Sequence, residues 1–226
     1  MNGKLRVHSI FESISGEAGF FPQGTWCSFI RLQGCPLRCR WCDTHNAQSI
    51  KGGKSYSIED LLFQKFLGNI LITGGEPLAQ RDDLQTLVAT LVREGHNIQI
   101  ETNGMIFPFG LDRQSSRVGW VVDYKLASSG MSEHMLNPLL LAYILDASQN
   151  NSLKFVVADE DDLKQAINIS RVLIKNHKCV NKFIISPVGA KGAFIPKIVN
   201  QIKVEFPELL EQVIFSVQIH KLIDLP

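Results

Sequence analysis

Short apolar runs alternate with amphipathic segments along most of the chain. In the clearest amphipathic segment, apolar residues recur at the spacing of one helix face, namely at Leu84, Leu87, Val88 and Leu91. Runs with strand character occupy residues 25–33, 69–73, 97–102, 120–124, 153–157, 183–187 and 213–218. Helical patterns occupy residues 58–66, 81–94, 137–147, 159–177 and 195–206. This alternation predicts parallel βαβ units.

The order of these units predicts an α/β fold in which six or seven parallel strands form an open or incomplete barrel with helices outside. Such a TIM-like (β/α)6-type arrangement places active residues on the loops that follow the strands. No internal repeat, low-complexity segment or linker divides the chain, so we expect one domain over residues 1–226. The stretch 107–119 has the weakest pattern and is predicted to be a surface loop.

The charge distribution excludes some classes of partner. The formal net charge is +1 and the basic residues are scattered, which gives no electrostatic reason to expect direct nucleic-acid binding. No apolar run reaches the roughly 18 residues of a membrane span, and the N-terminus lacks the apolar core of a signal peptide. We therefore expect a cytoplasmic protein without membrane contact. Among the five cysteines, we interpret Cys27 and Cys179 as structural thiols.

The other three cysteines, Cys35, Cys39 and Cys42, fall within eight residues in the pattern Cys-x3-Cys-x2-Cys. Three thiolates held this close can bind three irons of a [4Fe–4S] cluster and leave the fourth iron open to a bidentate ligand. Zinc is the main alternative, with His45 or Cys179 as the fourth ligand that a structural zinc site requires. Three thiols without any metal are the remaining alternative.

A second motif, Gly74-Gly75-Glu76-Pro77, follows an apolar strand about thirty residues beyond the cysteines. Its glycines permit close approach of the backbone to a ligand, and Glu76 offers a carboxylate facing that ligand. The alternative is a tight turn with an exposed glutamate. Trp41, just before the last cysteine of the loop, is either a ligand contact or a packed aromatic.

The cysteine spacing, the aromatic before the last cysteine and the Gly-Gly-Glu-Pro motif together resemble the radical S-adenosylmethionine (radical SAM) superfamily. This resemblance implies that a reduced cluster donates an electron to S-adenosylmethionine, and that the resulting 5′-deoxyadenosyl radical abstracts a hydrogen atom from the substrate. It further implies that Trp41 lies beside the adenine and that the Gly-Gly-Glu-Pro motif holds the methionyl amine.

Other stretches narrow the resemblance to the 7-carboxy-7-deazaguanine synthase family. They are Glu12 to Glu17, Arg31, Cys42-Asp43-Thr44, Thr73 and Gln218 to Lys221. The family implies conversion of 6-carboxy-5,6,7,8-tetrahydropterin to 7-carboxy-7-deazaguanine with release of ammonia, in the biosynthesis of queuosine and other 7-deazapurines. The implied cofactors are a [4Fe–4S] cluster, S-adenosylmethionine and Mg2+. The implied partners are the pterin, an electron donor such as flavodoxin or ferredoxin, and a second copy of the chain in a homodimer.

The resemblance also implies a set of site residues. The metal ligands are Cys35, Cys39 and Cys42 for the cluster and Thr44 for magnesium. The cofactor contacts are Trp41, Asp43, Gly75, Glu76, Asp123, Tyr124, Lys125, Ser186, Pro187, Val188 and Gly189. The substrate contacts are Ile14, Ser15, Gly16, Glu17, Arg31, Thr73, His220 and Pro226. One departure is Ser15, which stands where many members carry the longer glutamine.

Two other functions are compatible with the motifs. A glycyl-radical-enzyme activase shares the cysteine motif and the small size, but it acts on a protein backbone and needs no pterin pocket. A zinc- or cluster-bearing interaction module would leave the Gly-Gly-Glu-Pro motif without a purpose. For the homodimer, the sequence offers one candidate contact, an exposed segment from Phe107 to Phe109.

Overall fold

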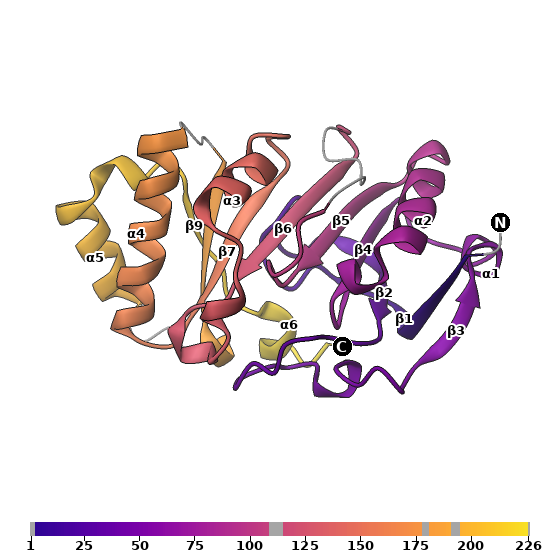
Figure 1. Ribbon diagram of the computed structural model, residues 1–226. Helices are drawn as coiled ribbons and strands as arrows, with labels where there is room; N and C mark the ends of the chain where they lie inside the picture. The colour runs from indigo at the N-terminus through magenta and orange to yellow at the C-terminus, as the bar shows by residue number, and fades with distance from the viewer. Residues whose placement is uncertain (1–2, 109–114, 178–180, 191–194, 226) are drawn as a thin grey trace.

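The computed structural model describes residues 3–108, 115–177, 181–190 and 195–225 (Figure 1). One sheet runs through these residues. In spatial order its strands are β3 (Lys54–Ser57), β1 (Lys4–Ile14), β2 (Trp26–Leu32), β4 (Asn69–Gly74), β5 (Asn97–Thr102), β6 (Val118–Tyr124), β7 (Ser152–Val157), β8 (Lys182–Pro187) and β9 (Val213–Phe215). β1 pairs antiparallel with both β2 and β3, and every pairing from β2 to β9 is parallel.

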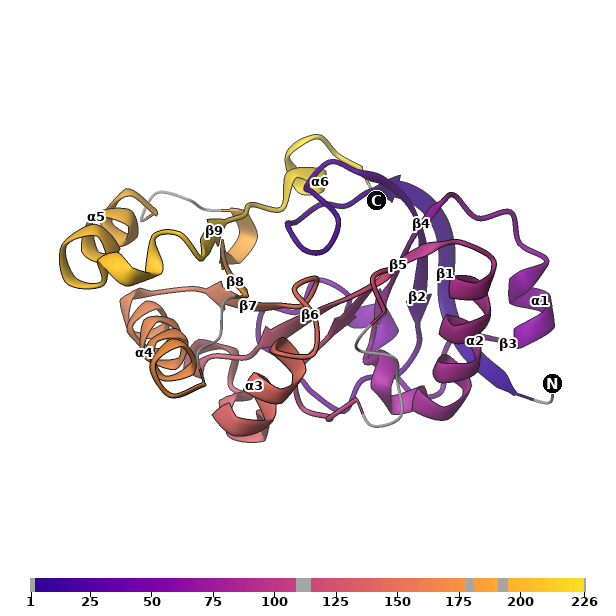
Figure 2. The same cartoon turned by 90° about the horizontal axis from the view of Figure 1, so that it is seen from above.

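The helices cover one face of this sheet. They are α1 (Ile58–Leu62), α2 (Arg81–Arg93), α3 (Pro138–Leu145), α4 (Glu160–His177) and α5 (Ile195–Glu205). Figure 2 shows α2, α3 and α4 side by side on that face, while the short α6 (Ile219–Leu222) lies on the other side, beside the loop between β1 and β2. The helices pack on the face of the sheet, whereas the loops that follow the parallel strands lie at the ends of those strands, where a site can form.

Local sequence explains where two of these helices form. Ser57 Oγ accepts a hydrogen bond from Asp60 N, and the Asp60 carboxylate accepts one from Ser57 N, so α1 begins with a capping box. On α2, Leu84, Leu87 and Leu91 are fully buried against the sheet. The main core thus lies between the sheet and the helical layer.

The predicted α/β class, with parallel strands and outer helices, is confirmed. In the described residues the parallel part of the sheet has seven strands, β2 and β4 to β9, in agreement with the predicted six or seven. β1 and β3 were not predicted, because the polar residues of β1 hide its alternation of exposed and buried positions. The helix predicted over 58–66 ends at Leu62, and the strand predicted over 213–218 ends at Phe215. One domain over residues 1–226 stays a prediction.

Only the two ends of the stretch 107–119 depart from the predicted surface loop, and residues 109–114 lie outside the described residues. Phe107 is 8% exposed and packs near Tyr143, with ring centroids 6.4 Å apart, and Pro108 is also buried. An exposed dimer contact at Phe107 is therefore wrong, while Phe109 lies outside the described residues. At the other end of the stretch, β6 already begins at Val118.

Within the described ranges, no helix combines the length and the apolar character needed to cross a membrane.

Candidate active site

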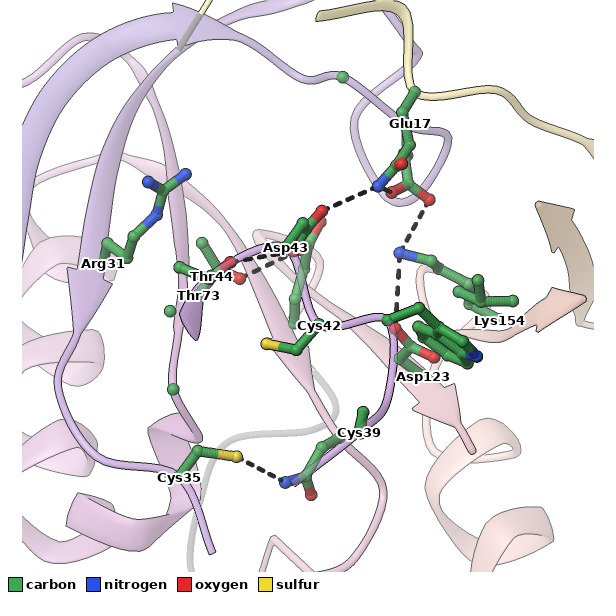
Figure 3. Close-up of a pocket in the computed structure, with 18 of the residues that line it drawn as sticks. Glu17, Arg31, Cys35, Cys39, Cys42, Asp43, Thr44, Thr73, Asp123 and Lys154 are labelled. Atoms are coloured by element: carbon green, nitrogen blue, oxygen red, sulfur yellow. Dashed lines mark hydrogen bonds and ion pairs between the residues drawn. The ribbon is translucent and has the colours of Figure 1, made fainter. Parts of the chain in front are cut away.

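A cavity of about 430 Å³ opens at the carboxyl ends of the parallel strands (Figure 3). Its walls come from the cysteine loop after β2, from the ends of β4, β5 and β6, from β7 and the turn after β8, and from the C-terminal segment that contains α6. This is the position at which parallel α/β folds place their active residues. The prediction that the strand-end loops carry the site is therefore consistent with the cavity.

The cysteine loop lines one side of this cavity. Two backbone bonds hold its start: Gly34 N donates to Ala47 O at 2.7 Å, and Cys35 N donates to Gln48 O at 3.0 Å. Gly34 has a φ of +98°, a backbone conformation that favours glycine. Cys35, Cys39 and Cys42 all line the cavity, and burial raises the pKa of the Cys35 and Cys39 thiols.

The three thiols belong to the wall of a single cavity. In the part of the chain that the structure describes, no three cysteine, histidine or acidic side chains are placed to hold a single metal ion. Zinc ligands meet at one ion about 2 Å away, whereas the ligands of a cluster are spread over its irons. Three soft thiolate donors on one cavity wall are the ligand type of an iron–sulfur cluster.

Cys27 is separate from this group. It is buried in a small cluster with Phe21, Phe29 and Leu71, and burial raises the pKa of its thiol to about 12. Both observations support the predicted role as a structural thiol. Cys179 lies outside the described residues.

Arg31, near the end of β2, brings a cation to the wall of the cavity. Its guanidinium carbon lies 4.9 Å from the centre of the Phe11 ring, and Phe11 in turn stacks on Phe29. Burial lowers the pKa of Arg31, against the opposing effect of nearby Asp43 and Glu101. Because its buried Nε has no hydrogen-bond partner, this side chain has unused capacity to bind an anion.

A buried charge network lies across the cavity from Arg31 (Figure 3). Lys154 Nζ is 2.8 Å from Glu17 Oε2 and 3.6 Å from Asp123 Oδ2, and Lys125 Nζ is 2.8 Å from the same Asp123 oxygen. Burial alone would lower the pKa of Lys154, but Glu17 and Asp123 raise it above its ordinary value. Asp123 Oδ1 is buried without a hydrogen-bond partner and can accept a bond from a ligand.

Glu101 joins the cavity wall from β5, where the sequence did not predict a site residue. Its carboxylate accepts hydrogen bonds from Thr73 Oγ1 and Gln99 Nε2, both at 3.1 Å. Burial raises the pKa of Glu101 despite the opposing effect of Lys154. A polar residue at every second position of an apolar strand (Gln99, Glu101, then Asn103) was the available signal.

The C-terminal segment closes over the other side. Gln218 Nε2 lies 3.0 Å from both Glu17 Oε1 and Asp43 Oδ2, and Lys221 Nζ lies 2.9 Å from Asp43 Oδ2. His220 packs so close to Gly16 that a Cβ there would lie 1.8 Å from its Nδ1, and burial lowers the pKa of His220. Gln218 and Lys221 are thus two more cavity residues that were not predicted as contacts.

Most predicted site residues do meet at the cavity. Beyond the cysteines, those that line it are Ile14, Gly16, Glu17, Arg31, Trp41, Asp43, Thr44, Thr73, Gly75, Asp123, Lys125, Val188, Gly189 and His220. Trp41 donates from Nε1 to Ser128 Oγ at 3.3 Å, with Lys125 Nζ 5.2 Å from its ring centre. Thr44 Oγ1 donates to Asp43 Oδ1 at 3.0 Å, which puts two oxygens side by side.

Several predicted contacts are not among the cavity-lining residues. Ser15 is buried, and its hydroxyl donates to the Glu17 carbonyl at 2.9 Å. Glu76 is also fully buried, with its carboxylate hydrogen-bonded to the chain. Tyr124 packs edge-on against Phe155, because successive residues of a strand face opposite sides. Ser186 and Pro187 are buried at the end of β8, and Pro226 lies outside the described residues.

Comparison with known proteins agrees with this geometry. Residues 29–113 match the family model of the Radical SAM superfamily. The chain is 38% identical to the 7-carboxy-7-deazaguanine synthase of Hyperthermus butylicus over 73% of this chain and 70% of the relative. It is 33% identical to that of Methanospirillum hungatei over 98% of this chain and 86% of the relative. The crystal structure of QueE from Escherichia coli has the same fold, with a TM-score of 0.68 at 21% identity, over 95% of this chain and 93% of that one.

Fold, cysteine loop and superfamily match together define a radical SAM protein, whose cofactors are a [4Fe–4S] cluster and S-adenosylmethionine. The residues present fit both groups: three thiols supply soft ligands, and the unpartnered Asp123 Oδ1 supplies an acceptor for the cofactor's N–H or O–H donors. Within this class, the chain belongs to the 7-carboxy-7-deazaguanine synthase family. The relatives favour this family over the activase and the zinc module.

Proposed function

We propose that this protein is a radical SAM lyase that converts 6-carboxy-5,6,7,8-tetrahydropterin to 7-carboxy-7-deazaguanine with release of ammonia, in the biosynthesis of queuosine and other 7-deazapurines. The observation that carries the proposal is one cavity with three thiols on one side and an unpaired arginine Nε on another. Two relatives named 7-carboxy-7-deazaguanine synthase each align with 98% of this chain, which supports transfer of the activity for which they are named.

In this proposal, Cys35, Cys39 and Cys42 hold the cluster. With S-adenosylmethionine bound, the cluster would provide the radical chemistry that removes a hydrogen atom from the substrate. Asp123 uses its free Oδ1 to accept a hydrogen bond from the cofactor, and Lys125 fixes that carboxylate through its contact with Oδ2. Trp41 supplies an aromatic surface beside the last cysteine for the adenine.

The substrate lies between Arg31 and the Glu17 side of the cavity. Arg31 presents a planar guanidinium, held by the Phe11 ring, to the carboxylate of the pterin. Glu17, fixed by Lys154 and Gln218, faces the guanidine-like edge of the pterin ring. Thr73 and His220 line the same space and supply further polar contacts.

Thr44 is the proposed protein ligand of Mg2+. The ion prefers oxygen ligands and retains several of its waters, so one hydroxyl from the protein and oxygens of the substrate are sufficient. The neighbouring Asp43 carboxylate, 3.0 Å from the Thr44 hydroxyl, adds negative charge at this position.

The proposal extends to partners and location. Because the cluster must be in its reduced state before it can act, the enzyme needs a one-electron donor such as flavodoxin or ferredoxin, although the conversion of pterin to deazaguanine and ammonia is itself redox-neutral. A reduced cluster also suits the cytoplasm, which keeps thiols reduced. We further propose a homodimer.

The activity test uses anaerobic, reconstituted protein with S-adenosylmethionine, reductant, Mg2+ and the carboxytetrahydropterin. We expect a deazaguanine product and one ammonia per turnover. The variant Arg31→Lys keeps the charge but loses the two-pronged contact, and we expect the KM for the pterin to rise about tenfold or more. The control is Arg171→Lys, at an exposed ion pair with Glu208, which should leave KM unchanged. Absence of the product from the wild-type enzyme would refute the substrate assignment.

A further inference from the structure

Asn103, directly after β5, places a hydrogen-bond donor beside one of the three thiols. Its side-chain Nδ2 lies 3.6 Å from Cys35 Sγ, within hydrogen-bond range for sulfur, and Figure 3 draws this contact at Cys35. Asn103 lines the cavity and is only 8% exposed. It was not among the residues predicted from the sequence.

The orientation of the Asn103 amide is set by its other end. Oδ1 accepts a hydrogen bond from Met105 N at 3.0 Å, and a backbone N–H can only donate. The amide oxygen must therefore face Met105, which turns the NH2 group toward the sulfur.

Glu76 fixes both partners of this contact relative to one another. Its Oε2 accepts from Asn103 N at 2.7 Å, while its own backbone N donates to Gly34 O, directly before Cys35, at 2.8 Å. Its Oε1 accepts from Thr102 Oγ1 at 2.8 Å and from Leu78 N at 2.9 Å. The carboxylate that the sequence assigned to the cofactor is thus committed to the chain.

We propose that Asn103 donates a hydrogen bond to the Cys35 thiolate and thereby raises the reduction potential of the cluster, with Glu76 as the positioning residue that holds the donor in place. The inference rests on the proposed role of Cys35 as a cluster ligand. A hydrogen bond to a ligand sulfur draws charge from it, and the reduced cluster carries one negative charge more than the oxidised one. The bond therefore stabilises the reduced form more than the oxidised form.

The test is an anaerobic redox titration of the reconstituted holoprotein without S-adenosylmethionine, followed by electron paramagnetic resonance of the reduced cluster. Asn103→Leu removes the donor, and Asn103→Asp removes it while keeping an acceptor for Met105 N. For each we expect the equilibrium constant for reduction to fall about tenfold, which is a shift of about 59 mV to lower potential for one electron. Glu76→Gln removes a negative charge near Cys35 in addition to an acceptor, and the lost charge alone would raise the potential, so its potential should lie above that of Asn103→Leu.

The control is Asn97→Leu, the same substitution at the far end of β5, where Asn97 Nδ2 bonds Asn69 Oδ1. Its potential should equal that of the wild type. If both Asn103 variants also keep the wild-type potential, or if both lose the cluster while Asn97→Leu retains it, the tuning role is overturned. A wild-type protein that binds zinc without sulfide, or forms no deazaguanine, refutes the proposed function. A wild-type cluster indifferent to Asn103 refutes only this inference.

Discussion

Replacing Lys154 by methionine removes the cation from the most buried charge network of the site. The Lys154 and Glu17 side chains are only 8% and 10% exposed, and their charged atoms are 2.8 Å apart. The Asp123 side chain, 17% exposed, lies 3.6 Å away on the other side. The substitution keeps most of the apolar stem but leaves buried carboxylates without this compensation. Breaking a buried ion pair in this way costs about 3–5 kcal/mol of unfolding free energy.

For a chain of this size, that cost corresponds to a fall of about 6–20 °C in Tm. The assay is thermal unfolding of reconstituted protein under anaerobic conditions, at matched cluster content. The control is Lys164→Met, because Lys164 and its partner Asp161 are 58% and 88% exposed and such pairs contribute less than about 1 kcal/mol.

The pH dependence of the Lys154→Met penalty gives the sharper test. In the wild type, Glu17 and Asp123 raise the pKa of Lys154 above its ordinary value of about 10.5. The stability that Lys154 contributes is therefore fully present below that value, and is lost only as the pH rises through the higher folded pKa. The Lys154→Met penalty should therefore be the same at about pH 7 and about pH 9, and should shrink only as the pH rises above about 10.5. A penalty equal to that of Lys164→Met, or one that already shrinks between about pH 7 and about pH 9, would refute this reasoning.

Three further substitutions test the framework of the site. Gly75→Ala would place a Cβ 2.1 Å from the Gly34 carbonyl oxygen, so iron content after reconstitution should drop severely, whereas Gly68→Ala, with nothing within 4 Å, should leave it unchanged. Asn137→Ala removes the side-chain cap of α3 and should lower Tm by about 2–4 °C, from a loss of about 1 kcal/mol, and a Tm equal to the wild type would argue against the cap. Thr44→Ala should preserve the cluster but weaken stimulation of turnover by Mg2+, and undiminished stimulation would exclude Thr44 as its ligand.

The parallel part of the sheet could be predicted from the sequence because its strands are largely buried and most of their residues are apolar. β1 escaped prediction because it is antiparallel and only partly covered. Leu5 and Val7 are buried while Lys4 and Arg6 are exposed, and the following residues are mostly half-buried. The alternation is therefore too short to stand out from a polar N-terminal segment.

The cysteine loop was equally accessible, because its function depends on spacing within eight residues. Contacts between segments that are distant in the sequence could not be predicted in this way. The sequence placed Tyr124 beside Asp123 in one cofactor-binding group, although adjacent strand residues face opposite sides and only Asp123 lines the cavity.

Lys154 is a residue whose unusual position could be recognised in the sequence, although the anion that pairs with it could not. A lysine between Leu153 and Phe155 in a buried strand is anomalous, since burying a charge without a counter-charge costs too much free energy for a stable fold. The strand pattern alone therefore requires an anion near Lys154. Which anion it is depends on the approach of the loop after β1, where Glu17 lies, and that approach depends on the C-terminal segment holding Glu17 through Gln218. The chemistry of the site was thus implicit in single residues, but their pairing is a property of the folded chain.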